Sequence, residues 1–335
     1  MEIFFDFEKP IIALEKKLAE LREIASSDGV DLSREISTLE KKFEDLVKST
    51  YADLTTWQRV QLSRHPSRPY TLDYWEQIFP DFQELHGDRV FGDDAALIGG
   101  TAIWNVHGKK VPVVIMGHQK GRTTKQKVER NFGMARPEGY RKAIRLFQLA
   151  ERFRLPVITF IDTPGAYPGL DAEERGQSQA IAESILEMFK LTVPTCSVVI
   201  GEGGSGGALA IGIGNRVLMQ EFSIYSVISP ESCASILWSD STQAARAAER
   251  LKITANDLGA MKLVDFIIPE PNGGGHRDRT RAIESLKIGL ESSFGALATQ
   301  DFNDPRSQTS LKIKEDRYQK FRHMGDFAMK STQGE

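Results

Sequence analysis

The sequence predicts an α/β fold built on a largely parallel sheet. Strand-like runs alternate with amphipathic helical segments from residue 137 onward. The runs at 156–162 and 194–200 are apolar over most of their length, which is typical of strands that helices cover on both faces. Both runs end in glycine-containing turns, and α/β proteins bind their ligands at such strand ends.

Residues 9–65 predict a helical hairpin. Apolar residues recur there every three or four positions on both sides of a break at 26–29, and charged residues fill the positions between them. The hairpin would either pack on its own domain or act as a contact arm between subunits. We predict three parts: a subunit-contact arm over 1–65, a main domain over 66–300 and a charged, helical tail over 301–335.

Local patterns define the elements of the main domain. Pro66 and Pro69 interrupt regular structure and mark its beginning. Tyr140, Ile144 and Phe147 share one face of a helical segment, as do Ile181, Ile185 and Met188 of a later one. The expected order is strands 95–103 and 111–117, helix 137–154, strand 156–162, helix 172–190, strand 194–200, short helix 205–214, strand 216–227, helical segments to 262, strand 264–269, helix 279–296 and a helical tail at 305–325.

Composition excludes several classes of protein. A net charge of −3 gives no reason to expect nucleic-acid or membrane binding. No apolar stretch approaches the roughly 20 residues that a membrane helix needs. The first residues lack the basic and apolar regions of a secretory signal. With only Cys196 and Cys233, the chain holds neither a disulfide scaffold nor a four-cysteine zinc site, so we expect a cytoplasmic protein without a metal of its own.

The glycine-rich run at 201–207 fits several motifs. It matches the dinucleotide fingerprint, but the helix that it opens is too short for that fold. It also matches a nucleophile elbow around Ser205, with Asp265 and His276 following in the order of a catalytic triad, although nothing evident holds His276 in place. A turn that only permits close packing is a third interpretation. In a fourth, free backbone N–H groups at the start of a helix stabilise a developing oxyanion.

Other segments resemble functional motifs more weakly. Residues 162–165 resemble the D-x-x-G of GTPases, but the sequence has no phosphate-binding loop to accompany them. Residues 260–263 resemble the surroundings of a biotinylated lysine, yet Lys262 follows a helical stretch and is expected on the surface. A cluster of basic residues either binds phosphates or forms a solvated face; it comprises Lys120, Arg122, Lys125, Lys127 and Arg130.

A second glycine-bearing turn, at 162–169, follows the preceding parallel strand. The carboxyl ends of neighbouring parallel strands meet at one edge of a sheet, so the two turns are expected to form a common pocket. Such a pocket would offer backbone donors and few ionisable groups. It would suit a reaction in which electrostatic stabilisation of an anion outweighs acid–base catalysis.

The chain resembles the carboxyltransferase alpha subunits of bacterial-type acetyl-CoA carboxylase over residues 6–322. The segments that carry the resemblance are 117–122, 131–134, 137–143, 162–169, 173–178, 201–212, 225–231 and 267–271. The resemblance implies a crotonase/ClpP-like spiral of ββα units. It implies transfer of a carboxyl group from N-carboxybiotin, held on a biotin carboxyl carrier protein, to acetyl-CoA. The product would be malonyl-CoA, in the first committed step of fatty-acid synthesis.

The resemblance also implies roles for residues. The backbone N–H groups of Gly206 and Gly207 would hold the ureido oxygen of biotin, with Ala208 as an alternative donor. Gly165 and Ala166 would line the same pocket, and no protein base would be needed because the biotin itself takes the acetyl proton. Gly203 and Gly204 would permit the turn, the N-terminus of a 205–214 helix would add its dipole, and Lys120, Arg122 and Arg130 are weaker candidates for phosphate contacts. Tyr225, Ser226 and Ser229 lie on the strand after the loop, where packing of the pocket is the simpler interpretation.

The implied partners include a beta subunit in an α2β2 carboxyltransferase, which would carry a zinc ribbon and most contacts to CoA. A separate biotin carboxylase would use ATP. Three alternatives stay open: a stand-alone hydratase with Glu202 as its base, a serine hydrolase that uses Ser205, and a non-catalytic scaffold.

Overall fold

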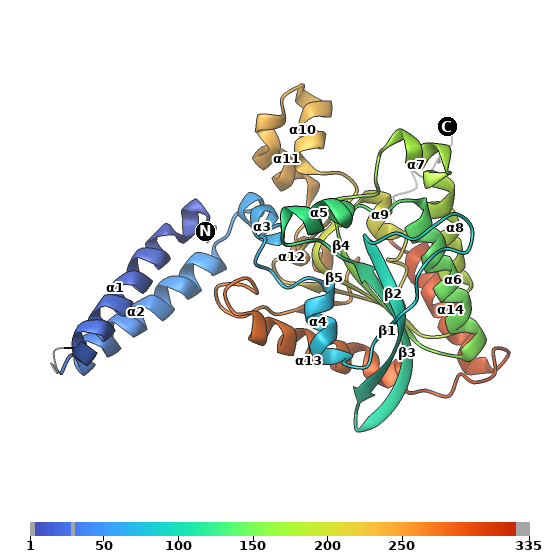
Figure 1. Ribbon diagram of the computed structural model, residues 1–335, viewed down its shortest axis with the longest axis horizontal. Helices are drawn as coiled ribbons and strands as arrows, with labels where there is room; N and C mark the ends of the chain where they lie inside the picture. The colour runs from blue at the N-terminus through green and yellow to red at the C-terminus, as the bar shows by residue number, and fades with distance from the viewer. Residues whose placement is uncertain (1–3, 28–30, 326–335) are drawn as a thin grey trace, which may run out of the picture.

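A mixed sheet forms the centre of the molecule, and helices cover both of its faces (Figure 1). The computed structural model describes residues 4–27 and 31–325. The strands are β1 (Gln83–Glu84), β2 (Leu97–Val106), β3 (Lys109–His118), β4 (Val157–Thr163), β5 (Thr195–Gly204), β6 (Arg216–Gln220), β7 (Ile224–Ser226) and β8 (Phe266–Ile268). Their order is β1-β2-β3-β4-β5-β6-β8, antiparallel up to β3 and parallel beyond it, while β7 pairs with the end of β5.

The alternation of side chains along β3 builds two separate cores. Val114 and Met116 face one core, which α6 (Pro137–Phe153), α8 (Gln177–Lys190) and α14 (Gln308–Arg322) complete. Val113 and Ile115 face the other, which α4 (Thr71–Ile78) and α13 (Arg279–Ala298) complete. Every residue of β4 is buried, as expected for a parallel strand covered on both faces.

Four predicted elements differ from the structure. The predicted helix 172–190 is two helices, α7 (Leu170–Glu174) and α8, because Gly176 adopts a φ of +78° between them. The predicted strand 194–200 continues to Gly204, since β7 offers it a second partner at 202–204. The predicted strand 216–227 is interrupted at 221–223 and forms β6 and β7. The predicted helix 205–214 is shorter, as α9 (Ser205–Leu209).

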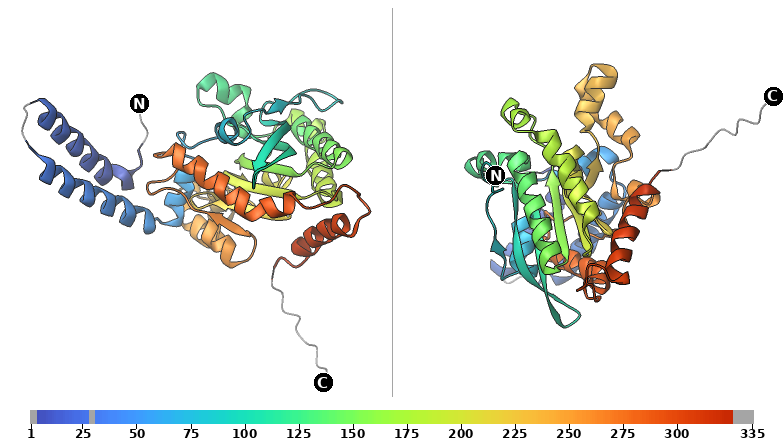
Figure 2. Two further views of the ribbon diagram at one scale, coloured as in Figure 1. Left: turned by 90° about the horizontal axis from the view of Figure 1, so that it is seen from below. Right: turned by 90° about the vertical axis from the view of Figure 1, so that its right-hand side faces the viewer.

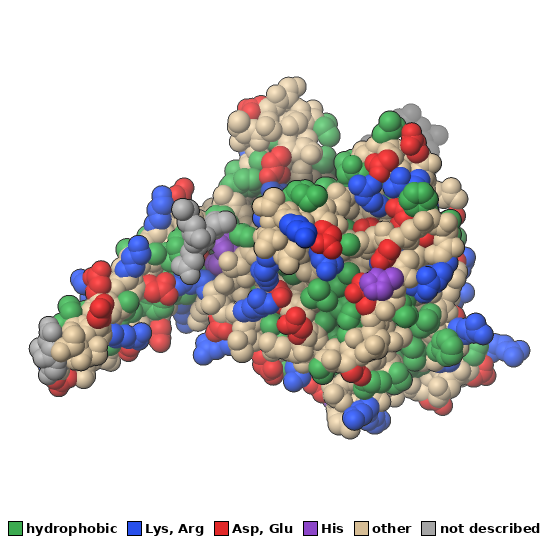
Figure 3. All heavy atoms as spheres, viewed as in Figure 1, with side chains coloured by type: hydrophobic (Ala, Val, Ile, Leu, Met, Phe, Trp, Pro, Cys, Tyr) green, Lys and Arg blue, Asp and Glu red, His purple; other side chains and the backbone are tan. Residues whose placement is uncertain are grey.

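The N-terminal helices α1 (Lys9–Ser27) and α2 (Ser33–Ala52) form an antiparallel pair that projects from the body of the molecule (Figures 1 and 2). Basic and acidic side chains intermingle along the visible face of this hairpin (Figure 3). The 28–30 part of the predicted break lies outside the described residues, as do 1–3 of the arm and 326–335 of the tail. The other helical elements are η1 (Asp6–Glu8), α3 (Thr56–Ser63), α5 (Thr124–Glu129), η2 (Asn131–Gly133), α10 (Pro230–Trp238), η3 (Ser241–Gln243), α11 (Ala244–Leu251) and α12 (Ala255–Ala260).

Buried polar contacts fix both ends of the described chain to the body. The Glu8 carboxylate, which is fully buried, accepts hydrogen bonds from Tyr51 of α2 (2.7 Å) and from His276 of the main domain (2.9 Å). Near the other end, Arg317 of α14 donates to the Thr195 hydroxyl (2.9 Å) and to the Asn215 side chain (2.7 Å). Across residues 4–27 and 31–325, no helix has the length and apolar character that crossing a membrane requires.

Candidate active site

The two glycine-bearing turns meet where β4 and β5 end. A β-carbon built on Gly204 would lie 2.1 Å from the carbonyl oxygen of Pro164, and one built on Gly207 would lie 2.5 Å from the amide nitrogen of Ala166. Both distances are far shorter than real contacts of a β-carbon allow, so a side chain at either position would force the turns apart. The glycines therefore let two backbones touch, and the predicted meeting of the turns at one sheet edge is found.

Free backbone donors lie at this junction. Ser205 opens α9 with a φ of +53°, which turns the chain sharply from strand to helix. N–H groups in the first turn of a helix have no acceptor within it, and the hydrogen bonds of the described residues include none from the N–H of Gly206 or Gly207. Ala208 comes one residue later, where helix geometry normally supplies an acceptor. With only five residues, α9 has little of the dipole expected from a 205–214 helix.

The second turn has one occupied and one available donor. The Gly165 N–H donates to the Thr163 hydroxyl (3.1 Å), which in turn donates to the Gly165 carbonyl oxygen (2.7 Å). This local bridge holds the turn in shape. The Ala166 amide nitrogen faces Gly207 across the junction, so Ala166 adds a third N–H group to the same small region.

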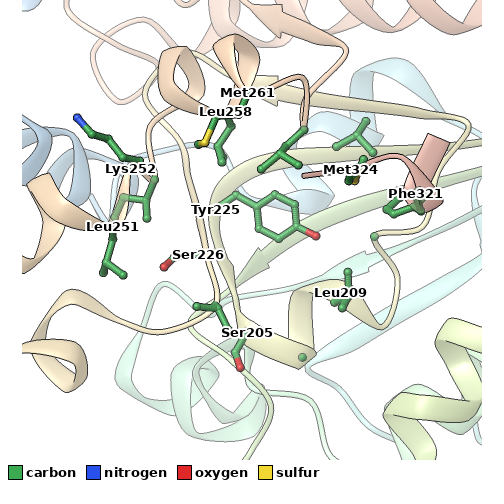
Figure 4. Close-up of a pocket in the computed structure, with 16 residues that line it drawn as sticks. Ser205, Leu209, Tyr225, Ser226, Leu251, Lys252, Leu258, Met261, Phe321 and Met324 are labelled. Carbon is green, nitrogen blue, oxygen red and sulfur yellow. The ribbon is translucent and has the colours of Figure 1, made fainter. Parts of the chain in front are cut away.

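An apolar pocket of about 410 Å³ opens beside this junction (Figure 4). In the close-up, Tyr225 lies between Ser205 on one side and Leu258 and Met261 on the other. The burial of Tyr225 raises the pKa of its hydroxyl to about 12, so this hydroxyl is neutral. Among the described residues that line the pocket there is no carboxylate and no histidine; they are Ser205, Gly206, Leu209, Gly212, Val217, Tyr225, Ser226, Val227, Leu251, Lys252, Ile253, Leu258, Met261, Leu263, Phe321 and Met324.

A chain of ion pairs lies beneath the glycine run. The ammonium group of Lys120 contacts the carboxylates of Asp162 (2.8 Å) and Glu202 (2.9 Å), and Arg64 contacts Glu202 from the other side (2.6 Å). Burial alone would raise the pKa of Glu202, but the charges of Lys120 and Arg64 outweigh it and lower that pKa. Glu202 is therefore an ionised, paired carboxylate, which argues against its use as the free base of a hydratase.

The three predicted phosphate ligands all have partners within the chain. Lys120 is held in the ion pairs just described. Arg122 donates to the carbonyl oxygen of Pro66 (2.8 Å) and lies over the ring of Tyr70. Arg130 donates to the carbonyl oxygen of Ala95 (2.8 Å). Their assignment to phosphate binding stays a prediction.

The residues of the alternative catalytic triad do not come together. His276 is held by Glu8, and its ring lies 4.3 Å from that of His65, measured between centroids, so the expectation that nothing fixes it is wrong. Asp265 accepts from the N–H of Val217 (2.6 Å) and pairs with Lys320. No hydrogen bond of the described residues joins Ser205 to either of them, and so these three residues do not form the hydrogen-bonded series that a serine hydrolase needs.

Two buried residues at the site were not identified from the sequence. His118 is fully buried near the glycine run; burial first, and the charge of Lys120 second, lower its pKa to about 3, so it is neutral. The hydroxyl of Tyr140 lies 3.1 Å from the position of a β-carbon on Gly207. Both residues lie in segments of the resemblance, but neither is distinguishable by sequence from a packing residue.

Together these features define an α/β protein in which backbone N–H groups of two glycine-bearing turns lie beside an apolar pocket. The profile of the acetyl co-enzyme A carboxylase carboxyltransferase-like family matches residues 4–325. The chain is 55% identical over 323 residues to the acetyl-coenzyme A carboxylase carboxyl transferase subunit alpha of Thermus thermophilus, covering 96% of this chain and 98% of that protein. It is 54% identical to the subunit of the same name from Geobacter metallireducens, with the same coverage. The chain belongs to this family.

Solved structures share the fold at low sequence identity. Transcarboxylase 12S, with methylmalonyl-coenzyme A bound, aligns with a TM-score of 0.53 and 20% identity over 70% of this chain and 43% of that one. A Pseudomonas malonate decarboxylase hetero-tetramer in complex with coenzyme A aligns with a TM-score of 0.55 and 14% identity over 75% of this chain and 98% of that one. The predicted crotonase-like fold is thereby confirmed.

Proposed function

We propose that this chain is the alpha subunit of an acetyl-CoA carboxylase carboxyltransferase and that it provides the biotin half of the active site. The carboxyl group would pass from N-carboxybiotin to acetyl-CoA, giving malonyl-CoA for fatty-acid synthesis. A C–N bond to the carboxyl carbon breaks, a C–C bond to the acetyl methyl carbon forms, and the methyl proton ends on the biotin nitrogen. The observation that supports this most is the pair of N–H groups of Gly206 and Gly207, which have no acceptor among the described residues and lie beside a pocket whose described lining has no carboxylate and no histidine.

The residues of this chain would stabilise the negative charge that develops on biotin and would hold the two turns in position. As the carboxyl group leaves, negative charge grows on the ureido oxygen, and the N–H groups of Gly206 and Gly207 would donate to it. Ala166 would add a donor from the facing turn, and Gly165, which is not among the residues that line the apolar pocket, would lie at the junction beside it. Gly203 and Gly204 would permit the approach of the two turns. The apolar lining around Tyr225 would exclude water and so strengthen these hydrogen bonds.

The remaining assignments follow from the family. Biotin would arrive on a carrier protein, and this chain would hold no cofactor of its own. A beta subunit would complete an α2β2 enzyme, carry the zinc and bind most of the CoA, while a separate biotin carboxylase would consume ATP. The 1–65 hairpin would be the contact arm of this assembly, and Lys120, Arg122 and Arg130 would be candidates for phosphate contacts. We place this enzyme in the cytoplasm.

The reverse reaction tests the proposal. Malonyl-CoA and biocytin are mixed with this chain alone, with the beta subunit alone, and with both, and loss of the carboxyl group from malonyl-CoA is measured. Activity only with both chains would support a shared active site. Activity with this chain alone would contradict the division of labour. Absence of activity with a correctly assembled pair would contradict the function itself.

A further inference from the structure

Four buried or half-buried charges meet at Glu202, within the glycine run. They come from four separate places in the fold: Arg64 from the end of α3, Lys120 from the segment after β3, Asp162 from β4 and Glu202 from β5. The Lys120 side chain is 14% exposed, and those of Asp162 and Glu202 are 4% and 9% exposed. Charges this far from water are costly unless they are paired, and here each carboxylate has a cation within 3 Å.

The network is tied to the backbone that carries the donors. The N–H of Glu202 donates to Asp162 (3.0 Å), which fixes the end of β5 to the end of β4. A β-carbon on Gly201 would lie 2.4 Å from the same Asp162 oxygen, so the backbone of the run presses against this carboxylate. Gly206 follows Glu202 by four residues. Movement of the Glu202 or Asp162 carboxylate would therefore shift the turn that presents the N–H groups.

We propose that Lys120 and Arg64 are positioning residues for the glycine run: by neutralising Asp162 and Glu202 they hold its N–H groups in place and protect the site from two uncompensated negative charges. This inference rests on the proposed function, because it assigns the N–H groups a role in stabilising an anion. Without the cations, the carboxylates would repel both each other and the anion that forms above them.

Arg64 also extends the network outward. Its guanidinium group contacts Glu231 in the first turn of α10 at 2.5 Å, in addition to Glu202 at 2.6 Å. The pair α10–α11 projects from the body near α3 (Figure 1). One side chain thus connects the glycine run with a projecting part of the molecule. Other titratable groups act electrostatically on Asp162 or Lys120; they include Arg68, Tyr70, Tyr74 and His118.

Steady-state kinetics of the assembled enzyme, with malonyl-CoA and biocytin, test the inference. Lys120→Met should lower kcat at least about tenfold with little change in KM, since the N–H groups act mainly in the transition state. The loss should be smaller at about pH 6 than at about pH 8.5, because the two carboxylates, left with Arg64 as their one remaining cation in the network, share a proton more readily at low pH. Lys120→Met combined with Glu202→Gln should recover activity relative to Lys120→Met alone, since one of the two repelling charges is gone.

Lys142→Met is the matched control. The Lys142 side chain is 1% exposed, against 14% for Lys120, and pairs with Asp93 (2.5 Å), a residue outside the two turns. Its loss should therefore lower stability without the pH-dependent change in kcat. If Lys120→Met fails to fold, Arg64→Met takes its place, because the Arg64 side chain is 30% exposed and its loss should disturb the core less. Arg64→Met is then compared, alone and combined with Glu202→Gln, in the same way.

Two outcomes would overturn the inference. One is a loss of kcat that is independent of pH and is not relieved by Glu202→Gln, which would make the network merely structural. The other is a rise in the KM for malonyl-CoA at constant kcat, which would assign Lys120 to substrate phosphates. An inactive wild-type complex would instead count against the proposed function.

Discussion

Gly207 packs directly against the backbone of Ala166: a β-carbon at Gly207 would lie 2.5 Å from the Ala166 amide nitrogen. The contact joins the ends of two parallel strands, β4 and β5, and places three N–H-bearing residues within one small region. Gly206, the immediate neighbour, has more room, since its β-carbon would come no closer than 3.5 Å to Ile181. Adjacent glycines in one turn therefore have different steric requirements.

That difference predicts opposite outcomes for two alanine variants. Gly207→Ala should lower kcat about 100-fold or more, because the new methyl group separates the turns and misdirects the donors. Gly206→Ala adds a methyl group in ordinary contact with Ile181 and should retain most activity. Carboxyl transfer by each variant, assembled with the beta subunit, is the measurement. Equal losses in the two variants would contradict this account of the junction.

Ser205 should be dispensable for chemistry. Its φ of +53° makes it a turn residue, and neither His276 nor Asp265 contacts it. Ser205→Ala should keep activity within about threefold, and Ser205→Gly should be at least as stable, because glycine adopts positive φ without the cost of about 1 kcal/mol that a side chain adds. Covalent labelling of wild-type Ser205 by a fluorophosphonate, with loss of transfer in Ser205→Ala, would favour a serine hydrolase instead.

The apolar pocket should determine the affinity for biotin. Met261 lines it and is 48% exposed, so Met261→Trp can fill the opening without disturbing the core. We expect the KM for biocytin to rise about tenfold or more while the melting temperature stays within a few degrees. Leu186→Trp, on an exposed position of α8 outside the pocket, is the control. An unchanged KM in Met261→Trp would place the biotin elsewhere.

Glu8 should make the attachment of the hairpin dependent on pH. Burial alone would raise the pKa of Glu8, but hydrogen bonds from His276, the Phe5 N–H and Tyr51 outweigh it and lower the pKa to about 2. A carboxyl pKa that folding lowers contributes stability above its unfolded value of 4.5, and the contribution disappears as the pH falls toward 2.

Urea denaturation of Glu8→Gln checks this dependence. The variant should be less stable than wild type by about 1–3 kcal/mol at neutral pH, since buried partners lose their charged acceptor, and the difference should shrink at acid pH. Glu44→Gln, an exposed position on α2, should show no such trend. A difference in the free energy of unfolding that stays constant down to about pH 3 would mean that the packing of the Glu8 side chain, and not its charge, stabilises the protein.

The regular part of the fold was predictable because burial leaves a periodic pattern. The strand at 156–162 and the helix at 137–154 were located to within one or two residues, as β4 and α6. Interruptions were harder to predict. The break at Gly176 depends on one positive φ, and the division of 216–227 depends on β7 finding a partner at the end of β5. Neither the left-handed backbone of Gly176 nor the pairing of β7 with β5 could be predicted from the periodic pattern of apolar residues.

The candidate site likewise combines features that the sequence predicts with features that it does not. The meeting of the two glycine turns followed from the rule that parallel strands end at one edge. The contribution of Arg64 could not be found in this way, because it lies 138 residues before Glu202 and its role depends on where α3 packs. The burial of Lys120 between Asp162 and Glu202 could not be predicted either, since a lysine in a basic segment has no sequence mark of pairing.

The central claim is that backbone N–H groups of the glycine run stabilise the developing anion. Replacing the amide before Gly206 or Gly207 with an ester removes one N–H and adds no side chain. The kcat for malonyl-CoA decarboxylation with biocytin, measured in the assembled enzyme, should fall roughly 100- to 1,000-fold for each replacement, with KM little changed. Full activity in both ester variants would contradict the claim.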